Sequence, residues 1–166
     1  MKEVARLRTS LLGSFPNDVR NSFFSHGEGN PLSWIEFKRQ PDADTLSRLE
    51  HHLQKFAEVF SLPSLRMASL GEADLPTKIE ILSALRYLAP VNLQTLVTHL
   101  REQKLTVPSS DWANRRLDAL RKGRMVLRRP DGTYVLTMGA LEKLGTRKDR
   151  RSPDVSRVLA LAQRRS

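Results

Sequence analysis

The chain has 166 residues, of which 39% are hydrophobic and 28% charged, and its formal net charge is +10. This length suits one ordinary domain or two small ones, and the composition is too apolar for a disordered chain. Because the chain contains no cysteine, disulfides, thiolate zinc sites and cysteine nucleophiles are excluded. No run reaches the length of a membrane-spanning helix, and the N-terminus lacks the apolar stretch of a signal peptide. We therefore expect a soluble cytoplasmic protein that makes no contact with a membrane.

The net positive charge lies in the second half of the chain. Residues 1–75 hold 9 Lys and Arg against 10 Asp and Glu, residues 76–145 hold 12 against 6, and residues 146–166 hold 7 against 2. Such asymmetry points to a polyanionic partner for the C-terminal half. The alternative is a basic surface that serves only solubility.

The first 40 residues predict two short helices, then a loop and a possible short strand. Apolar residues at helical spacing predict an amphipathic helix over Lys2–Phe15, and Val19, Phe23 and Phe24 suggest a second helix. Glycine, asparagine and proline mark residues 26–32 as a loop. The alternation over Trp34–Arg39 is compatible with a short strand.

A longer helix is predicted over Thr45–Phe60, with Asp44 as its N-cap. Its apolar stripe consists of Leu46, Leu49, Leu53, Phe56 and Phe60. This stripe is too apolar to leave exposed, so residues 1–62 are interpreted as a helical region for dimerisation or interaction. The expected partner is a second copy of the chain or another protein. Residues 63–75, which include Pro63 and Gly71, are interpreted as a linker.

Three further helices are predicted after Pro76, which suits the first turn of a helix. The first helix has an apolar face at Ile79, Leu82, Leu85 and Leu88 and ends at Pro90. The second follows an N-cap at Asn92 and covers Leu93–Leu100. The third covers Asp111–Lys122, with an N-cap at Ser109 or Ser110 and a left-handed C-terminal residue at Gly123. Two β-prone runs follow, Met125–Arg129 and Tyr134–Thr137. The Asp131-Gly132 pair between them is a strong hairpin signal. A short helix, Met138–Leu144, closes the unit at Gly145.

The segment SSDWANRRLDALRKGRMVLRRPDGTYVLT, residues 109–137, resembles the winged helix-turn-helix family of DNA-binding domains. The resemblance covers residues 76–145, although Gly139 follows Thr137 by two residues where many members have three. It implies a mainly α fold with a small β-hairpin wing, preceded here by the N-terminal helical region. It also implies that the third helix, residues 111–122, is the recognition helix that contacts DNA. The wing, residues 124–137, is then expected to contact the minor groove or flanking phosphates.

The candidate DNA-binding residues lie on the predicted outer face of that helix, at its start and along the wing. They are Ser109, Ser110, Asn114, Arg115, Asp118, Arg121, Lys122, Arg124, Arg128 and Arg129. Arg, Asn and Asp side chains can read base edges in the major groove, and serines at a helix start can contact phosphate. A solvated helix face with ordinary surface charges is the alternative. We expect Trp112 in the core and Tyr134 packed between wing and helix.

The tail, residues 146–166, combines a basic run with a predicted short helix. The run contains Arg147, Lys148, Arg150 and Arg151, and Ser152 caps a helix whose apolar residues extend from Val155 to Leu161. We expect this helix to dock on the protein or on a partner chain.

No catalytic, metal or cofactor site is predicted. His51 and His52 are adjacent and point to different faces of one helix, while His26 and His99 are isolated. No nucleophile elbow or phosphate-binding glycine loop is present. The sequence therefore predicts a non-enzymatic protein that binds double-stranded DNA in the nucleoid, as a transcription regulator. The alternative is a winged-helix subunit of a larger nucleic-acid complex in defence, recombination or chromosome maintenance.

Overall fold

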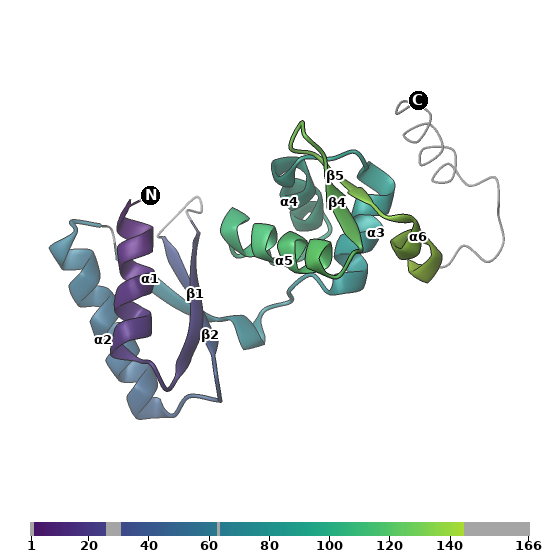
Figure 1. Cartoon of the computed structure of the whole chain (residues 1–166). Helices are drawn as coiled ribbons and strands as arrows, with labels where there is room; N and C mark the ends of the chain where they lie inside the picture. The colour runs from purple at the N-terminus through teal and green to yellow at the C-terminus, as the bar shows by residue number, and fades with distance from the viewer. Residues whose placement is uncertain (1, 26–30, 63, 145–166) are drawn as a thin grey trace. The chain divides into compact units, whose positions relative to one another are not determined.

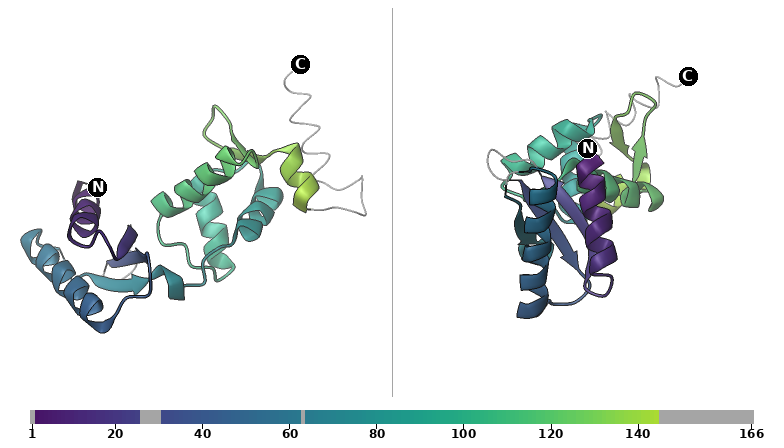
Figure 2. Two further views of the ribbon diagram at one scale, coloured as in Figure 1. Left: turned by 60° about the horizontal axis from the view of Figure 1, so that its bottom comes forward. Right: turned by 90° about the vertical axis from the view of Figure 1, so that its left-hand side faces the viewer.

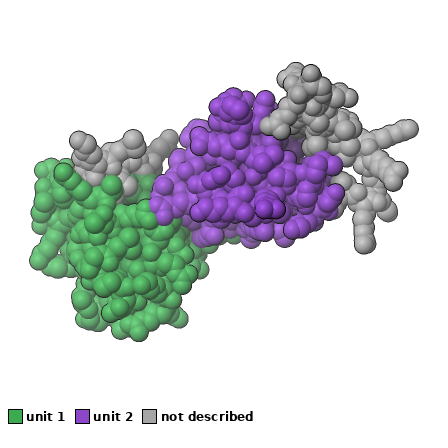
Figure 3. Space-filling view, in the orientation of Figure 1, with its two compact units in different colours: residues 1–74 green, residues 75–166 purple. Residues whose placement is uncertain are grey.

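A computed structural model describes residues 2–25, 31–62 and 64–144. The chain divides into two compact units, residues 1–74 (unit 1) and residues 75–166 (unit 2), shown in Figure 3. The described residues form six α-helices, one short 3-10 helix and five strands in two small sheets, so the fold is mainly α. The predicted tail helix lies outside these residues. No helix in the described ranges is long and apolar enough to cross a membrane.

Unit 1 is a mixed α/β unit built on a three-stranded sheet (Figure 1). Its elements are α1 (Lys2–Ser14), β1 (Val19–Ser25), β2 (Leu32–Phe37), α2 (Ala43–Val59), β3 (Arg66–Ser69) and a 3-10 helix, η1 (Leu70–Glu72). The central strand is β2, which pairs antiparallel with β1 and parallel with β3. A parallel partner requires a crossover connection, and α2 supplies it.

The helices α1 and α2 lie side by side over the sheet (Figures 1 and 2). Leu11 from α1, Leu49 and Leu53 from α2, and Ile35 from β2 are buried in one hydrophobic cluster. The stripe predicted for α2 therefore packs inside its own unit, where Phe56 is also buried. Since most of the stripe is already covered inside unit 1, it gives little reason to expect a homodimer.

Two predictions about the strands of unit 1 are wrong. The segment from Val19 to Ser25 is β1 and not a helix, because Ser22, Phe23 and Phe24 pair with residues of β2. Residues 66–69, placed in a linker by the sequence, form the edge strand β3 and end the sheet. The short strand expected over Trp34–Arg39 is confirmed as β2, shifted toward the N-terminus. The boundary between the units falls after Asp74.

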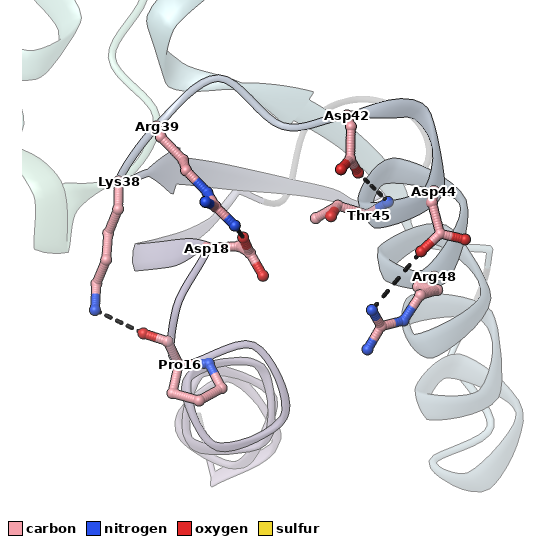
Figure 4. Close-up of polar contacts among 8 residues, drawn as sticks. All are labelled: Pro16, Asp18, Lys38, Arg39, Asp42, Asp44, Thr45 and Arg48. Carbon is pink, nitrogen blue, oxygen red and sulfur yellow. Dashed lines mark hydrogen bonds and ion pairs between the residues drawn. The ribbon is translucent and has the colours of Figure 1, made fainter.

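The connections that flank β1 and β2 are held by polar contacts at one end of the unit (Figure 4). Lys38 Nζ donates to the carbonyl oxygen of Pro16 at 2.6 Å, and Arg39 donates to Asp18 at 3.1 Å. The N-cap of α2 is Asp42, whose carboxylate accepts from the Thr45 N–H at 2.8 Å, and not Asp44 as expected. The bonds of Lys38 and Arg39 join the segment just after β2 to the segment just after α1.

Unit 2 consists of helices followed by a hairpin and a final helix. Its elements are α3 (Lys78–Leu88), α4 (Leu93–Glu102), α5 (Ser110–Lys122), β4 (Val126–Arg128), β5 (Tyr134–Leu136) and α6 (Met138–Leu144). The predicted N-caps Asn92 and Ser109 are confirmed, since each side chain accepts a backbone N–H of the first turn. The start of α3 differs from the prediction, because Thr77 and not Pro76 begins it as the N-cap.

The core of unit 2 lies where its helices meet the hairpin. Leu85, Leu96, Leu100, Leu117 and Val126 are almost fully buried, and they come from α3, α4, α5 and β4. The inward face of α3 is rotated from the predicted one. Ile79 remains 68% exposed while Ile81 and Ala84 are buried.

We predict that the start of α3 weakens in acid. The Thr77 hydroxyl and backbone N–H donate to Glu80 Oε2, each at 2.7 Å, and hold the pKa of Glu80 below its ordinary value of 4.5. A carboxyl whose pKa is lower in the folded state stabilises the fold above its unfolded pKa, and this contribution is lost as pH falls below 4.5. Denaturant unfolding between about pH 6 and about pH 3 should therefore show a smaller loss of stability for Glu80→Gln than for the wild type.

Glu142→Gln is the matched control, because Glu142 makes no ion pair or side-chain hydrogen bond with the residues that the structure describes. Its pH dependence should follow the wild type. If both variants follow the wild type, the Thr77–Glu80 contacts do not contribute to the acid sensitivity.

Candidate nucleic-acid interface

The helix α5 presents one face to the core and the other to solvent. Trp112, Ala113, Leu117 and Leu120 are buried, with Trp112 only 2% exposed, which confirms its predicted place in the core. At the helix start, the Ser109 hydroxyl accepts from the Trp112 N–H at 3.1 Å, while the next residue, the candidate Ser110, is exposed. The other candidate residues of α5 lie outside this buried face and are half-buried or exposed, as expected.

Two of the candidate arginines on α5 are paired with carboxylates of the same helix. Arg115 Nε lies 3.0 Å from Asp111 Oδ2, and Arg121 Nε lies 3.3 Å from Asp118 Oδ1. These spacings of four and three residues place each pair on one side of the helix. The pairs cancel much of the positive potential that these arginines would present to a polyanion.

Asn114 supports the hairpin. The hydroxyl of Tyr134 donates to Asn114 Oδ1 at 3.2 Å, and Tyr134 is only 3% exposed. This confirms that Tyr134 packs between the hairpin and α5. Asn114 is half-buried and, in the free protein, its side-chain oxygen is engaged in this contact.

The hairpin is extended by the segment between α3 and α4. Val91 and Tyr134 exchange two backbone hydrogen bonds, of 3.2 Å and 2.8 Å. β4 and β5 are paired from Val126↔Leu136 to Arg128↔Tyr134. Each of these strands has only three residues, so the added bridge to Val91 and the helix contacts are needed to hold them.

The turn from α5 into the hairpin contains a strained residue. Gly123 has φ −76° and is the C-cap, so it is not the left-handed residue that the sequence predicted. That role belongs to Arg124, with φ +55°. The Met125 N–H donates to the Leu120 carbonyl at 2.9 Å and the Arg124 N–H donates to the Arg121 carbonyl at 3.0 Å, which is the Schellman arrangement.

The three candidate arginines that follow α5 differ in their surroundings. Arg129 lies 3.4 Å from Asp131, whose pKa is held below its usual range mainly by the Thr133 side chain and also by the Thr133 N–H. Arg128 lies 5.9 Å from the centre of the Tyr134 ring, a cation–π geometry. Arg124 is exposed.

Some of the candidate cations pair with a carboxylate and others do not. Among the candidate residues, Arg115, Arg121 and Arg129 are paired with carboxylates. Lys122, Arg124 and Arg128 have no carboxylate partner in the part of the chain that the structure describes. These three lie between the last turn of α5 and the end of β4, and we call them the junction cations.

Two residues that position this site were not among the predicted site residues. The role of Val91 could not be predicted, because its hydrogen-bond partner Tyr134 is distant in sequence. Thr137 accepts from the Ala140 N–H at 3.1 Å as the cap of α6, and its hydroxyl donates to the Arg124 carbonyl at 2.8 Å. A threonine directly before a predicted helix is a visible cap signal, but its bond to Arg124 is not local.

The histidines in the described ranges do not converge. His52 bonds to the Ser10 hydroxyl at 2.8 Å in unit 1, and His99 stacks on Tyr87 in unit 2 with ring centres 6.1 Å apart. No cluster of three or more potential metal-ligating His, Asp or Glu side chains occurs among the described residues. His26 lies outside them.

No protein-family model, curated protein or solved structure matches the chain. Similarity therefore assigns neither a family nor an activity. Any functional conclusion must come from the geometry and charge of the units themselves.

We predict that the contact between Asn114 and Tyr134 stabilises unit 2. Asn114→Ala leaves a buried hydroxyl without its acceptor, and Tyr134→Phe removes that hydroxyl. A double-mutant cycle on the free energy of unfolding should give a coupling of about 1 kcal/mol. The control cycle pairs Tyr134→Phe with Lys122→Ala and should give none. Equal coupling in both cycles would contradict a specific hydrogen bond.

We also predict that Arg124 lowers the stability of the turn. A left-handed conformation is unfavourable for any residue with a Cβ atom and costs glycine little. Arg124→Gly should be more stable than Arg124→Ala by about 1 kcal/mol in denaturant unfolding, because both variants lose the charge and only glycine relieves the strain. Equal stability of the two variants would show that the φ of this residue is not strained.

Proposed function

We propose that unit 2 is a winged helix-turn-helix module that binds double-stranded DNA, chiefly through the phosphate backbone. The observation that carries the proposal is the group of junction cations, Lys122, Arg124 and Arg128, which lack carboxylate partners in the described chain. They follow one another from the end of α5 into the hairpin. Cations that are not neutralised by the protein are available to displace counterions from DNA.

The arrangement of elements supports this assignment. Three capped helices precede a hairpin that is bonded both to α5 and to the segment between α3 and α4. A helix of the size of α5 fits the major groove, and an adjacent hairpin can reach flanking phosphates. The excess of Lys and Arg over Asp and Glu in residues 76–145 gives the unit the charge that its partner requires.

The state of the α5 side chains favours phosphate contacts over strong base reading. Arg115 and Arg121 each use Nε to pair with a carboxylate of α5, so a base edge competes with Asp111 and Asp118 for these guanidinium groups. A base that bonds to Asn114 Oδ1 likewise competes with the Tyr134 hydroxyl. Binding then resembles the salt-dependent, largely sequence-independent mode of recognition.

Two biological roles follow from the same module. A transcription regulator that reads two-fold symmetric sites requires a dimer. The dimer hypothesis depended on the α2 stripe, of which Leu49, Leu53 and Phe56 are buried inside unit 1. This observation favours the second candidate, a non-enzymatic subunit of a larger nucleic-acid complex in which unit 1 contacts another protein.

Light scattering on the full chain tests the choice between these roles. The subunit hypothesis predicts a mass near 18.9 kDa, that of a monomer. A stable mass of twice that value would support the regulator and overturn our preference. DNA binding by unit 2 is compatible with both results and is tested separately.

We predict that the junction cations set the salt dependence of DNA binding. The triple variant Lys122→Gln/Arg124→Gln/Arg128→Gln removes three phosphate contacts. The slope of log affinity against log salt should therefore become shallower by about 3. Fluorescence anisotropy with a labelled duplex over a salt series measures this difference, whatever the tail contributes to both proteins.

A matched control removes the same charge from paired positions. Arg115→Gln/Arg121→Gln/Arg129→Gln should change the slope by less than about 1, because these arginines are bound to carboxylates. The proposal fails if the control alters the slope as much as the junction variant, or if the wild type does not bind duplex DNA.

A further inference from the structure

A pocket of about 310 Å³ opens within unit 2 between the start of α3 and the second half of α5. Its lining includes Lys78, Ile81, Arg116, Ala119, Leu120 and Met125. A volume of this size lies at the lower end of the range for small-molecule sites. It suits a ligand of one or two rings.

The lining of the pocket has two chemical parts. Ile81, Leu120 and Met125 are buried and give it an apolar floor. Lys78 and Arg116 are exposed and give it two positive charges at the rim. None of the lining residues is acidic.

The two rim cations are not neutralised by the described chain. Neither Lys78 nor Arg116 forms an ion pair with a carboxylate of the described residues, in contrast to Arg115 and Arg121 on the same helix as Arg116. The guanidinium carbon of Arg116 lies 5.1 Å from the centre of the Trp112 ring, which supports that side chain beside the pocket.

Glu80 is the nearest acidic residue to Lys78 in the sequence, and its carboxylate is already bound. Glu80 Oε2 accepts from the Thr77 N–H and hydroxyl, both at 2.7 Å. It thereby closes the start of α3 and is not among the residues that line the pocket. An anion at the rim therefore meets two cations and no lining carboxylate.

We propose that this pocket binds a small apolar carboxylate, such as an aromatic acid of one or two rings. The ring packs on Ile81, Leu120 and Met125, and the carboxylate lies between Lys78 and Arg116. The apolar floor selects against a bare inorganic anion, and the cationic rim selects against a neutral ring. This inference stands independently of DNA binding.

The test uses the full chain with 2-naphthoate as the probe and 2-naphthamide as its neutral analogue. Isothermal titration and the melting temperature should report saturable binding of naphthoate, with the amide weaker by about tenfold or more. Arg116→Gln and Lys78→Gln should each weaken naphthoate binding by about tenfold. Ala119→Phe places a large side chain at an exposed lining position and should abolish binding while the protein stays folded.

Two control variants separate local from general electrostatics. Arg121→Gln and Lys122→Gln remove one charge each from α5 outside the pocket and should leave the naphthoate affinity unchanged. Equal weakening by the rim and control variants would overturn the proposal, as would equal binding of naphthoate and naphthamide. The proposal would also be overturned if naphthoate did not bind at about 10 mM, or if inorganic phosphate bound as tightly as naphthoate.

Discussion

The organisation of unit 2 depends on Tyr134. Its backbone exchanges two hydrogen bonds with Val91, its hydroxyl donates to Asn114, and its ring faces the guanidinium of Arg128. One buried residue thus fixes the hairpin to the segment before α4, to α5 and to its own partner strand. Strands of three residues could not keep this geometry alone, because an isolated hairpin is marginal in water. Tyr134 therefore also holds Arg128, one of the junction cations, beside α5.

In the described part of unit 2, some cations form ion pairs with carboxylates and others do not. Exposed pairs such as Arg115 with Asp111 contribute little to stability, but they reduce the field that a distant polyanion meets. Two groups of cations have no carboxylate partner among the described residues, one at the turn from α5 to β4 and one at the pocket rim. Net charge alone does not distinguish these groups, so the distribution of carboxylates decides which surfaces attract anions.

Local signals in the sequence predicted the helices of unit 2, the caps Asn92 and Ser109, and the hairpin at Asp131-Gly132, because each depends on neighbouring residues. The sheet of unit 1 could not be predicted in this way. Val19 and Phe23 have helical spacing, and only their partners in β2 make the segment a strand, while β3 pairs with residues more than 30 positions earlier. The candidate site was predicted as a set of residues but not as a set of contacts. The pairs of Asp111 with Arg115 and Asp118 with Arg121 were visible from their spacing, whereas the contact of Asn114 with Tyr134 crosses 20 positions.

The position of β3 at the end of unit 1 has a consequence for synthesis of the chain. The central strand β2 gains its second neighbour only after residues 66–69 have left the ribosome, although α1, β1 and α2 are complete before then. Closing this parallel pair requires a long loop, which slows folding relative to the local contacts of the helices in unit 2. Until β3 docks, one edge of β2 presents unpaired backbone groups, which are a template for aggregation. A fragment that ends at residue 62 keeps that edge open permanently, whereas a fragment that ends at residue 74 contains the strand that covers it.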